Sequence, residues 1–158
     1  MDLAAILISQ YRASLEMLKQ TITECPESIW NVAGDKNKFW QVAYHALYFT
    51  HEYLTDPKET FTPWVKHRDV YDFDESQVFE PYDKESILEY LNFCQQQVAQ
   101  RVPRLNLEEP EGRGDRSMIM SELQIYSIRH IMQHTGELME RLGTRTEAQI
   151  DWVGSMHA

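Results

Sequence analysis

The stretch 127–138, SIRHIMQHTGEL, carries two histidines, His130 and His134, four positions apart. On an α-helix, residues at this spacing project from one face, one turn above the other. Two imidazoles so placed can bind a single metal ion when other groups complete its coordination shell. The third donor that the sequence offers is His45, on an earlier helical stretch. We therefore predict that His45, His130 and His134 bind one divalent metal ion inside a small helical bundle.

The pattern of apolar residues around these histidines predicts an all-α fold, a four-helix bundle formed by a single domain, 1–158. Apolar residues recur at helical spacing in four segments, about 3–23, 36–54, 84–102 and 117–142. Asp2, Asp35 and Asp83 stand where N-caps of the first three helices are expected. Gly143 is expected to end the fourth helix.

A long crossover, residues 55–82, joins the second and third predicted helices and shows no sustained periodicity. Such a connection is normal where two neighbouring helices of a bundle run parallel. The crossover is rich in aromatic residues, which suits two interpretations. They pin it to the bundle, or some of them cover the metal site and shape a substrate pocket. The first use is the commoner one.

The second predicted helix is apolar on nearly all sides. Trp40, Tyr44, Leu47 and His51 lie opposite the face that should enter the bundle. A helix of this kind needs cover on both faces. Either a second copy of the protein or the crossover 55–82 provides it, and the sequence favours neither. If a second copy provides the cover, we expect the protein to be a homodimer.

Composition and charge narrow the possible partners. The 158 residues carry a formal net charge of −10, so nucleic acids and anionic membranes are poor candidate partners. The partner that we expect is a small-molecule substrate. No apolar run is long enough to span a bilayer, and the first residues lack the pattern of a secretory signal. We therefore expect a cytoplasmic protein. The two cysteines, Cys25 and Cys94, are expected to be buried rather than reactive.

Two carboxylates lie on the same helix faces as the predicted ligands. Glu137 follows His134 by three positions, and Glu52 follows His45 by seven. Either is a candidate fourth ligand, hydrogen-bond acceptor for a ligand histidine, or proton carrier. We expect the other histidines, which are His51, His67 and His157, not to bind the metal.

Three histidine ligands leave one position for water or a thiolate, the arrangement typical of a catalytic metal. The alternative is that each histidine is an ordinary packing residue. This packing alternative is less favoured, because three buried imidazoles without partners would be energetically unfavourable. Three imidazoles suit zinc, nickel, iron and copper alike.

The run His130–Leu138, closing with Arg141, Leu142 and Gly143, resembles the last core helix of the DinB/YfiT-like family, and the helix around His45 resembles its second helix. Glu137 stands where that family more often has Gln. The resemblance implies a four-helix bundle with a long crossover, a histidine triad and frequent dimers. It also implies zinc, nickel or a similar divalent ion, with iron, manganese or copper as alternatives.

Characterised members of that family include S-transferases that use a low-molecular-weight thiol, bacillithiol or mycothiol. The resemblance therefore favours a thiol-dependent S-transferase in which the metal activates the thiol. A metal-dependent hydrolase is the enzymatic alternative. A non-enzymatic, dimeric metal-binding protein is the alternative from another class.

Overall fold

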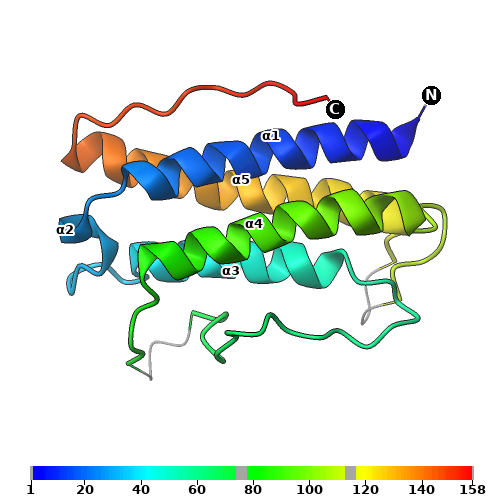
Figure 1. Ribbon diagram of the computed structural model, residues 1–158, viewed down its shortest axis with the longest axis horizontal. Helices are drawn as coiled ribbons and strands as arrows, with labels where there is room; N and C mark the ends of the chain where they lie inside the picture. Colours follow the sequence, from blue (N-terminus) through cyan, green and yellow to red (C-terminus); the bar gives the residue numbers. More distant parts are fainter. Residues whose placement is uncertain (1, 74–77, 113–116, 158) are drawn as a thin grey trace.

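The computed structural model describes residues 2–73, 78–112 and 117–157, which form five α-helices and no β-strand. A short 3₁₀ turn, Val102–Arg104, follows the fourth helix. The predicted all-α class is therefore confirmed. The helices are α1 (Leu3–Glu24), α2 (Glu27–Trp30), α3 (Phe39–Tyr53), α4 (Lys84–Arg101) and α5 (Met120–Arg145) (Figure 1).

The four long helices lie side by side (Figure 1), and α1 and α3 each pack against both α4 and α5. Their apolar stripes bury one continuous core. Its fully buried large side chains include Tyr11, Leu15, Leu18, Phe39, Trp40, Tyr44, Ile87 and Tyr90. Burial of this core supplies most of the stabilisation of the fold, because apolar burial scales with the area removed from water. The contact between α3 and α5 brings the helix of His45 beside the helix of His130.

Two of the three predicted N-caps are confirmed. The carboxylate of Asp2 accepts a hydrogen bond from the backbone N–H of Ala5 at 3.1 Å, and that of Asp83 accepts one from Ser86 at 2.6 Å. Each bond satisfies an N–H group that the first turn of the helix leaves unpaired.

The prediction that Asp35 caps the second helix is wrong. Helix α3 begins at Phe39, and the side-chain oxygen of Gln41 accepts from the backbone N–H of Lys38 at 2.8 Å. The carboxylate of Asp35 instead accepts two hydrogen bonds from the guanidinium of Arg145, at 2.7 and 2.8 Å. A bidentate ion pair of this kind is stronger than a single capping bond. These hydrogen bonds hold the pKa of Asp35 below its usual value.

The same ion pair explains a second wrong prediction, the end of the last helix at Gly143. Helix α5 continues to Arg145, and a side chain at position 143 would meet no neighbouring atom within 4 Å. Glycine inside a helix costs about 1 kcal/mol relative to alanine. Buried Leu142 and the pairing of Arg145 with Asp35 offset that cost.

The crossover 55–82 covers the second face of α3, so the second of the two alternatives for this face is confirmed. Trp40, Tyr44, Leu47 and His51 are at most 3% exposed within a single chain. The covering aromatic rings come from the crossover and from α4, and the described part of the crossover forms no helix. They are Phe61, His67, Tyr82, Tyr90 and Phe93. This face therefore gives no reason to expect a dimer, which stays a prediction without structural support.

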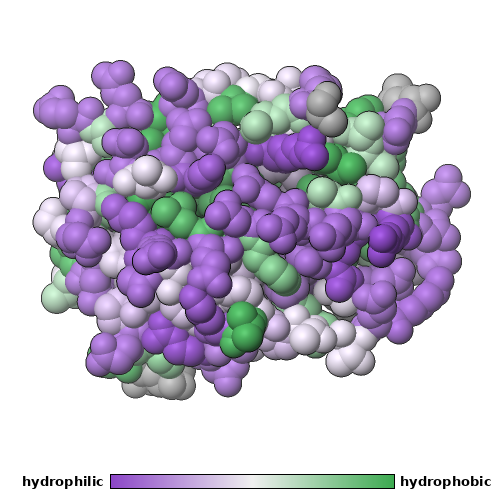
Figure 2. Space-filling view, in the orientation of Figure 1, coloured by the Kyte–Doolittle hydropathy of each residue, from purple (hydrophilic) through white to green (hydrophobic). Residues whose placement is uncertain are grey.

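The segment after α5 runs in extended form along α1 (Figure 1). Three hydrogen bonds attach it: Asp151 N–H to Gln20, the Gln10 side chain to the carbonyl of Gly154, and Met156 N–H to Ser9. Trp152 on this segment is 77% exposed. Figure 2 shows a face on which polar side chains predominate and hydrophobic ones are scattered. Among the described residues, every helix is too short or too polar to cross a bilayer.

Candidate metal centre

The three predicted ligands meet between α3 and α5. Nε2 of His130 lies 3.1 Å from Nε2 of His45 and 3.1 Å from Nε2 of His134. The three side chains offer ligand atoms that all lie within 4.8 Å of one another. His134 is buried, and His45 and His130 are partly buried. Helix spacing alone places His130 beside His134, whereas the packing of α3 on α5 adds His45.

The crossover fixes the ring of His45 from the outside of the bundle. Its Nδ1 lies 2.7 Å from the backbone carbonyl oxygen of Tyr71. Because a carbonyl only accepts, Nδ1 carries the proton and Nε2 keeps its lone pair. The ring of Phe73 stacks on His45 at a centroid distance of 4.3 Å, and the ring of Phe49 meets it edge-on at 4.8 Å. The ring is thus held in one tautomer and one orientation, as expected for a metal ligand.

A carboxylate fixes His134 in the same way. Nδ1 of His134 lies 3.2 Å from one oxygen of Glu137, and Arg141 donates to the other oxygen at 3.0 Å. Arg141 also donates to the backbone carbonyl of Asn37 at 2.8 Å. Glu137 therefore lies where it can accept a hydrogen bond from a predicted ligand, one of the three roles considered for it. A carboxylate in this place raises the basicity of the imidazole that it contacts.

These contacts leave a group of nitrogen lone pairs facing one another. The tautomers that donate from Nδ1 to Tyr71 and to Glu137 leave a lone pair on Nε2 of His45 and of His134, and Nε2 of His130 can donate to only one of them. In addition, Nδ1 of His130 is buried and has no hydrogen-bond partner among the described residues. Burial lowers the pKa of His45 to about 4 and that of His130 to about 3, so neither ring is charged at neutral pH. A cation between the rings would accept all of the lone pairs at once.

The spacing of the nitrogens is compatible with one cation between the three rings. Two nitrogens 3.1 Å apart, each about 2.0–2.1 Å from a common ion, subtend an angle of about 100° at that ion. This lies between the right angle of an octahedron and the tetrahedral angle. Three imidazole nitrogens also match the donor preference of zinc, copper, iron and nickel. The residues present therefore fit a divalent metal ion.

Two of the remaining histidines have other partners. Nδ1 of His51 lies 3.2 Å from the hydroxyl of Tyr90, on the side of α3 away from the triad. Nδ1 of His67 lies 2.7 Å from the hydroxyl of Tyr44, and its Nε2 lies 3.1 Å from Asp69. Within the described part of the chain, the three-histidine cluster is the one group with metal-ligand geometry. His157 lies in the segment after α5.

Glu52 does not join the cluster. It lies two turns of α3 beyond His45, about 10 Å along the helix axis, and the group of convergent ligand atoms does not include it. Among the described residues, three nitrogens are thus the whole set of convergent ligands.

The cysteines lie in the core, as predicted. Both are free and buried. Burial raises the pKa of Cys94 and raises that of Cys25 to about 12, so both stay protonated at neutral pH. Neither is a reactive thiolate.

Three features of the site were missed from the sequence. The backbone carbonyl of Tyr71 could not be recognised from the sequence as the acceptor for His45, because every residue has a backbone carbonyl. The stacking of Phe73 on His45 depends on the path of the crossover. The Glu137–Arg141 pair was open to prediction, because opposite charges four positions apart meet on a helix.

Fold and site together define an all-helical protein with a histidine cluster that could bind a metal ion. Comparisons with models of known protein families, with curated proteins and with solved structures found no match.

Proposed function

We propose that this protein is a metal-dependent enzyme whose metal is bound by His45, His130 and His134. The single observation that carries the proposal is the convergence of three Nε2 atoms, two of them 3.1 Å from the third. Three ligands leave a coordination position for a reactant, whereas structural zinc sites use four protein ligands. The core of the bundle is built from apolar stripes, so the ion is not needed to hold the helices together.

We further propose that the reaction is the transfer of a low-molecular-weight thiol to an electrophilic small molecule. The choice of a thiol is supported by the resemblance of His130–Leu138 to the last helix of the DinB/YfiT-like family. A divalent ion bound by three imidazoles supplies a Lewis acid, which lowers the pKa of a thiol that it binds. The sulfur would then form a bond to an electrophilic carbon, and the leaving group would depart with the electron pair of the broken bond.

The chain's own residues would prepare the site for this step. The Tyr71 carbonyl and the Glu137 carboxylate hold His45 and His134 with Nε2 directed at the same point. Arg141 binds Glu137 and so keeps the carboxylate beside His134. Phe73 and Phe49 limit the access of water to His45. Glu137 is also the nearest candidate for accepting the thiol proton, and this role stays a prediction, as does any role of Glu52.

The hydrolase alternative uses the same coordination position for a water molecule, and the structural observations favour neither enzyme over the other. The non-enzymatic alternative would require a closed coordination shell. The set of three convergent ligands in the described residues counts against it.

Thiol dependence tests the proposal. Protein loaded with zinc or nickel is incubated with 1-chloro-2,4-dinitrobenzene, with and without bacillithiol, cysteine or glutathione, and release of chloride is measured. We expect a rate that requires a thiol, saturates with it and disappears in His130→Ala. Equal catalysed rates with and without thiol would exclude the transferase and leave the hydrolase. No catalysed rate with any thiol would favour a binding protein.

Three further expectations belong to the same proposal. The side-by-side helices and the long crossover are consistent with a four-helix bundle of the DinB/YfiT-like type. The homodimer and the cytoplasmic location are proposed on the resemblance and on composition alone. Light scattering at micromolar concentration tests the dimer.

A further inference from the structure

The ring of His130 differs from the other two rings of the triad at its second nitrogen, Nδ1. Nδ1 of His45 lies 2.7 Å from the Tyr71 carbonyl, and Nδ1 of His134 lies 3.2 Å from the Glu137 carboxylate. Nδ1 of His130 is buried and has no hydrogen-bond partner among the described residues. A buried polar atom without a partner costs about 1–3 kcal/mol. A metal-binding histidine almost always has a partner at its second nitrogen, so His130 needs one.

The hydroxyl of Ser127 is a second buried group without a partner on the same helix. Ser127 is 1% exposed, and its Oγ makes no hydrogen bond within the described part of the chain. It precedes His130 by three positions on α5, so the Cβ atoms of the two residues are about 5–6 Å apart. Long side chains on a helix lean toward the preceding turn, which for His130 is the turn of Ser127. The two unpaired atoms can therefore come within hydrogen-bond distance of each other.

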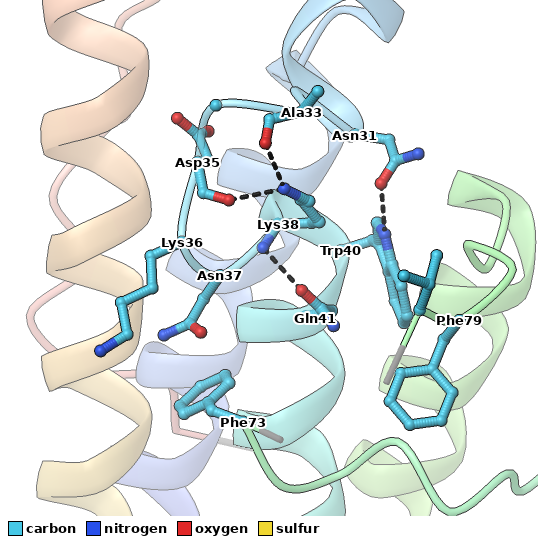
Figure 3. Close-up of a pocket in the computed structure, with 12 residues that line it drawn as sticks. Asn31, Ala33, Asp35, Lys36, Asn37, Lys38, Trp40, Gln41, Phe73 and Phe79 are labelled. Atoms are coloured by element: carbon cyan, nitrogen blue, oxygen red, sulfur yellow. Dashed lines mark hydrogen bonds between the residues drawn. The ribbon is translucent and has the colours of Figure 1, made fainter. Parts of the chain in front are cut away.

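The neighbouring cavities do not supply a partner for Nδ1. A cavity of about 560 Å³ lies at the start of α3 (Figure 3), and the residues that line it include Phe73 but not His130. His130 does line an open depression on the surface of α5, together with Tyr126 and Gln133, but its Nδ1 is buried and does not open into it. The partner of Nδ1 therefore comes from the core side of α5, where Ser127 lies.

A chain of buried hydrogen bonds leads from the surroundings of Ser127 toward α1. The side-chain amide of Gln124 donates to the Tyr53 carbonyl at 3.0 Å, which leaves its oxygen for Tyr11. The Tyr11 hydroxyl donates to that oxygen at 2.8 Å. Burial raises the pKa of Tyr11, and the nearby Ser127 hydroxyl lowers it by a smaller amount. Because the single hydroxyl hydrogen of Tyr11 is already used, the Tyr11 oxygen can only accept from Ser127.

The position of the ring proton of His130 determines what its partner must do. When the ring protons of His45 and His134 are on Nδ1, the proton that can lie among the three Nε2 atoms is that of His130. Nδ1 of His130 then has a lone pair and needs a donor. When Nε2 of His130 binds a metal ion, the neutral ring exchanges protons with water and carries its proton on Nδ1, which needs an acceptor. A hydroxyl suits both states, because it both donates and accepts.

We propose that Ser127 is a positioning residue for His130, and that its hydroxyl is the hydrogen-bond partner of Nδ1 in the metal-free and in the metal-bound protein. The metal-bound part of this statement rests on the proposed function. In the metal-free protein Ser127 donates to Nδ1. In the metal-bound protein Ser127 accepts from Nδ1 and donates to Tyr11. Ser127 thereby holds the third ring of the triad in place while the ring proton changes nitrogen, and it connects the metal centre to α1.

Nitrogen-15 NMR of the metal-free protein tests the hydrogen bond. The resonance of a bare imidazole nitrogen moves to higher frequency when the nitrogen loses a hydrogen-bond donor. We expect Ser127→Ala to move the Nδ1 resonance of His130 in this direction and to leave the other two rings of the triad unchanged. The control is Ser14→Ala, which removes a buried hydroxyl that bonds to the backbone of α1. An Nδ1 resonance of His130 that stays in place in Ser127→Ala would overturn the proposal.

Zinc affinity, measured by calorimetry, tests the positioning. We expect Ser127→Ala to bind zinc about 10- to 100-fold more weakly, the loss that is typical when a ligand histidine loses its partner. Ser14→Ala should bind zinc as wild type does, although both variants lose a buried hydroxyl. Ser127→Thr keeps the hydroxyl, so its affinity should stay within about threefold of wild type. Wild-type affinity in Ser127→Ala would overturn the proposal. The same would follow from equal losses in Ser127→Ala and in a Ser127→Thr protein that melts at the wild-type temperature.

The two measurements separate this inference from the proposed function. A wild-type protein that binds no metal, but whose His130 resonance moves in Ser127→Ala, would refute the metal centre and leave the hydrogen bond standing. A wild-type protein that binds zinc no more tightly than Ser127→Ala would refute the positioning role and leave the metal centre standing.

Discussion

Nε2 of His45 on α3 lies 3.1 Å from Nε2 of His130 on α5, although 85 positions of sequence separate the two residues. Two neutral imidazole nitrogens at this distance repel each other unless a proton or a cation lies between them. The hydrogen bond from His45 to the carbonyl of Tyr71 commits its proton to Nδ1. The two nitrogens therefore lie where both could bind one ion. Three predictions concern this cluster and its surroundings, and a fourth concerns His51 on the other side of α3.

Removal of a ligand should abolish metal binding and leave the fold intact. We expect His130→Ala to weaken zinc or nickel binding by about two orders of magnitude or more, because two imidazoles remain where three converged. Helix content by circular dichroism should stay near that of wild type. The control is His157→Ala, at an exposed position after α5. Retention of full affinity in His130→Ala, measured by calorimetry, would contradict the assignment of the triad.

The carboxylate of Glu137 should set the affinity of the site through His134. Glu137→Ala leaves Nδ1 of His134 without its acceptor, and we expect a loss of about 10- to 100-fold in metal affinity. Glu137→Gln should lose less, because the amide oxygen still accepts the hydrogen bond. Glu140→Ala, an exposed position on the same helix, is the matched control. Equal affinities in all four proteins would show that Glu137 does not act on the ligand.

Metal removal should lower the melting temperature and keep the helices. An ion present at 100 times its Kd stabilises the native state by about 2.7 kcal/mol. For a chain of this size that corresponds to a shift of about 5–10 °C. Calorimetric melting of metal-loaded and chelator-treated protein measures it. Unfolding of the chelated protein at room temperature would mean that the metal is structural, and the proposed enzymatic role would fail with it.

Buried His51 should make the fold sensitive to acid. Burial first, and then the charge of Arg101, lowers the pKa of His51 to about 4, whereas an unfolded histidine titrates near 6.5. Between these values the unfolded chain binds more protons than the native one. The contribution of His51 to stability is therefore complete above about pH 6.5 and is lost as the pH falls towards 4, by up to about 3 kcal/mol.

Urea unfolding at several pH values isolates this effect. His51→Phe keeps a ring among Phe61 and Phe93 and removes the titrating group. It should flatten the dependence of the unfolding free energy by up to about 1.4 kcal/mol per pH unit in that range. The slope is the measurement, because the lost contact with Tyr90 lowers stability equally at every pH. An unchanged slope would mean that His51 is not kept neutral by burial.

Several parts of the fold followed from the sequence because they depend on residues close together in the chain. The caps at Asp2 and Asp83 satisfy N–H groups three positions away, and the apolar stripes repeat within a few residues. The pairing of His130 with His134 is local in the same sense. The wrong predictions, a cap at Asp35 and an end at Gly143, share a single cause. The ion pair between Asp35 and Arg145 joins positions that are 110 residues apart.

The sequence by itself determined the all-helical class, the faces of the helices and two of the three converging nitrogens, because helical periodicity is a property of neighbouring residues. Only the tertiary structure decided that His45 meets the other two and that the crossover covers the second face of α3. It also decided that Phe73, which stacks on His45, lines a neighbouring cavity at the start of α3. These contacts join distant parts of the chain, and the packing of the whole core selects them.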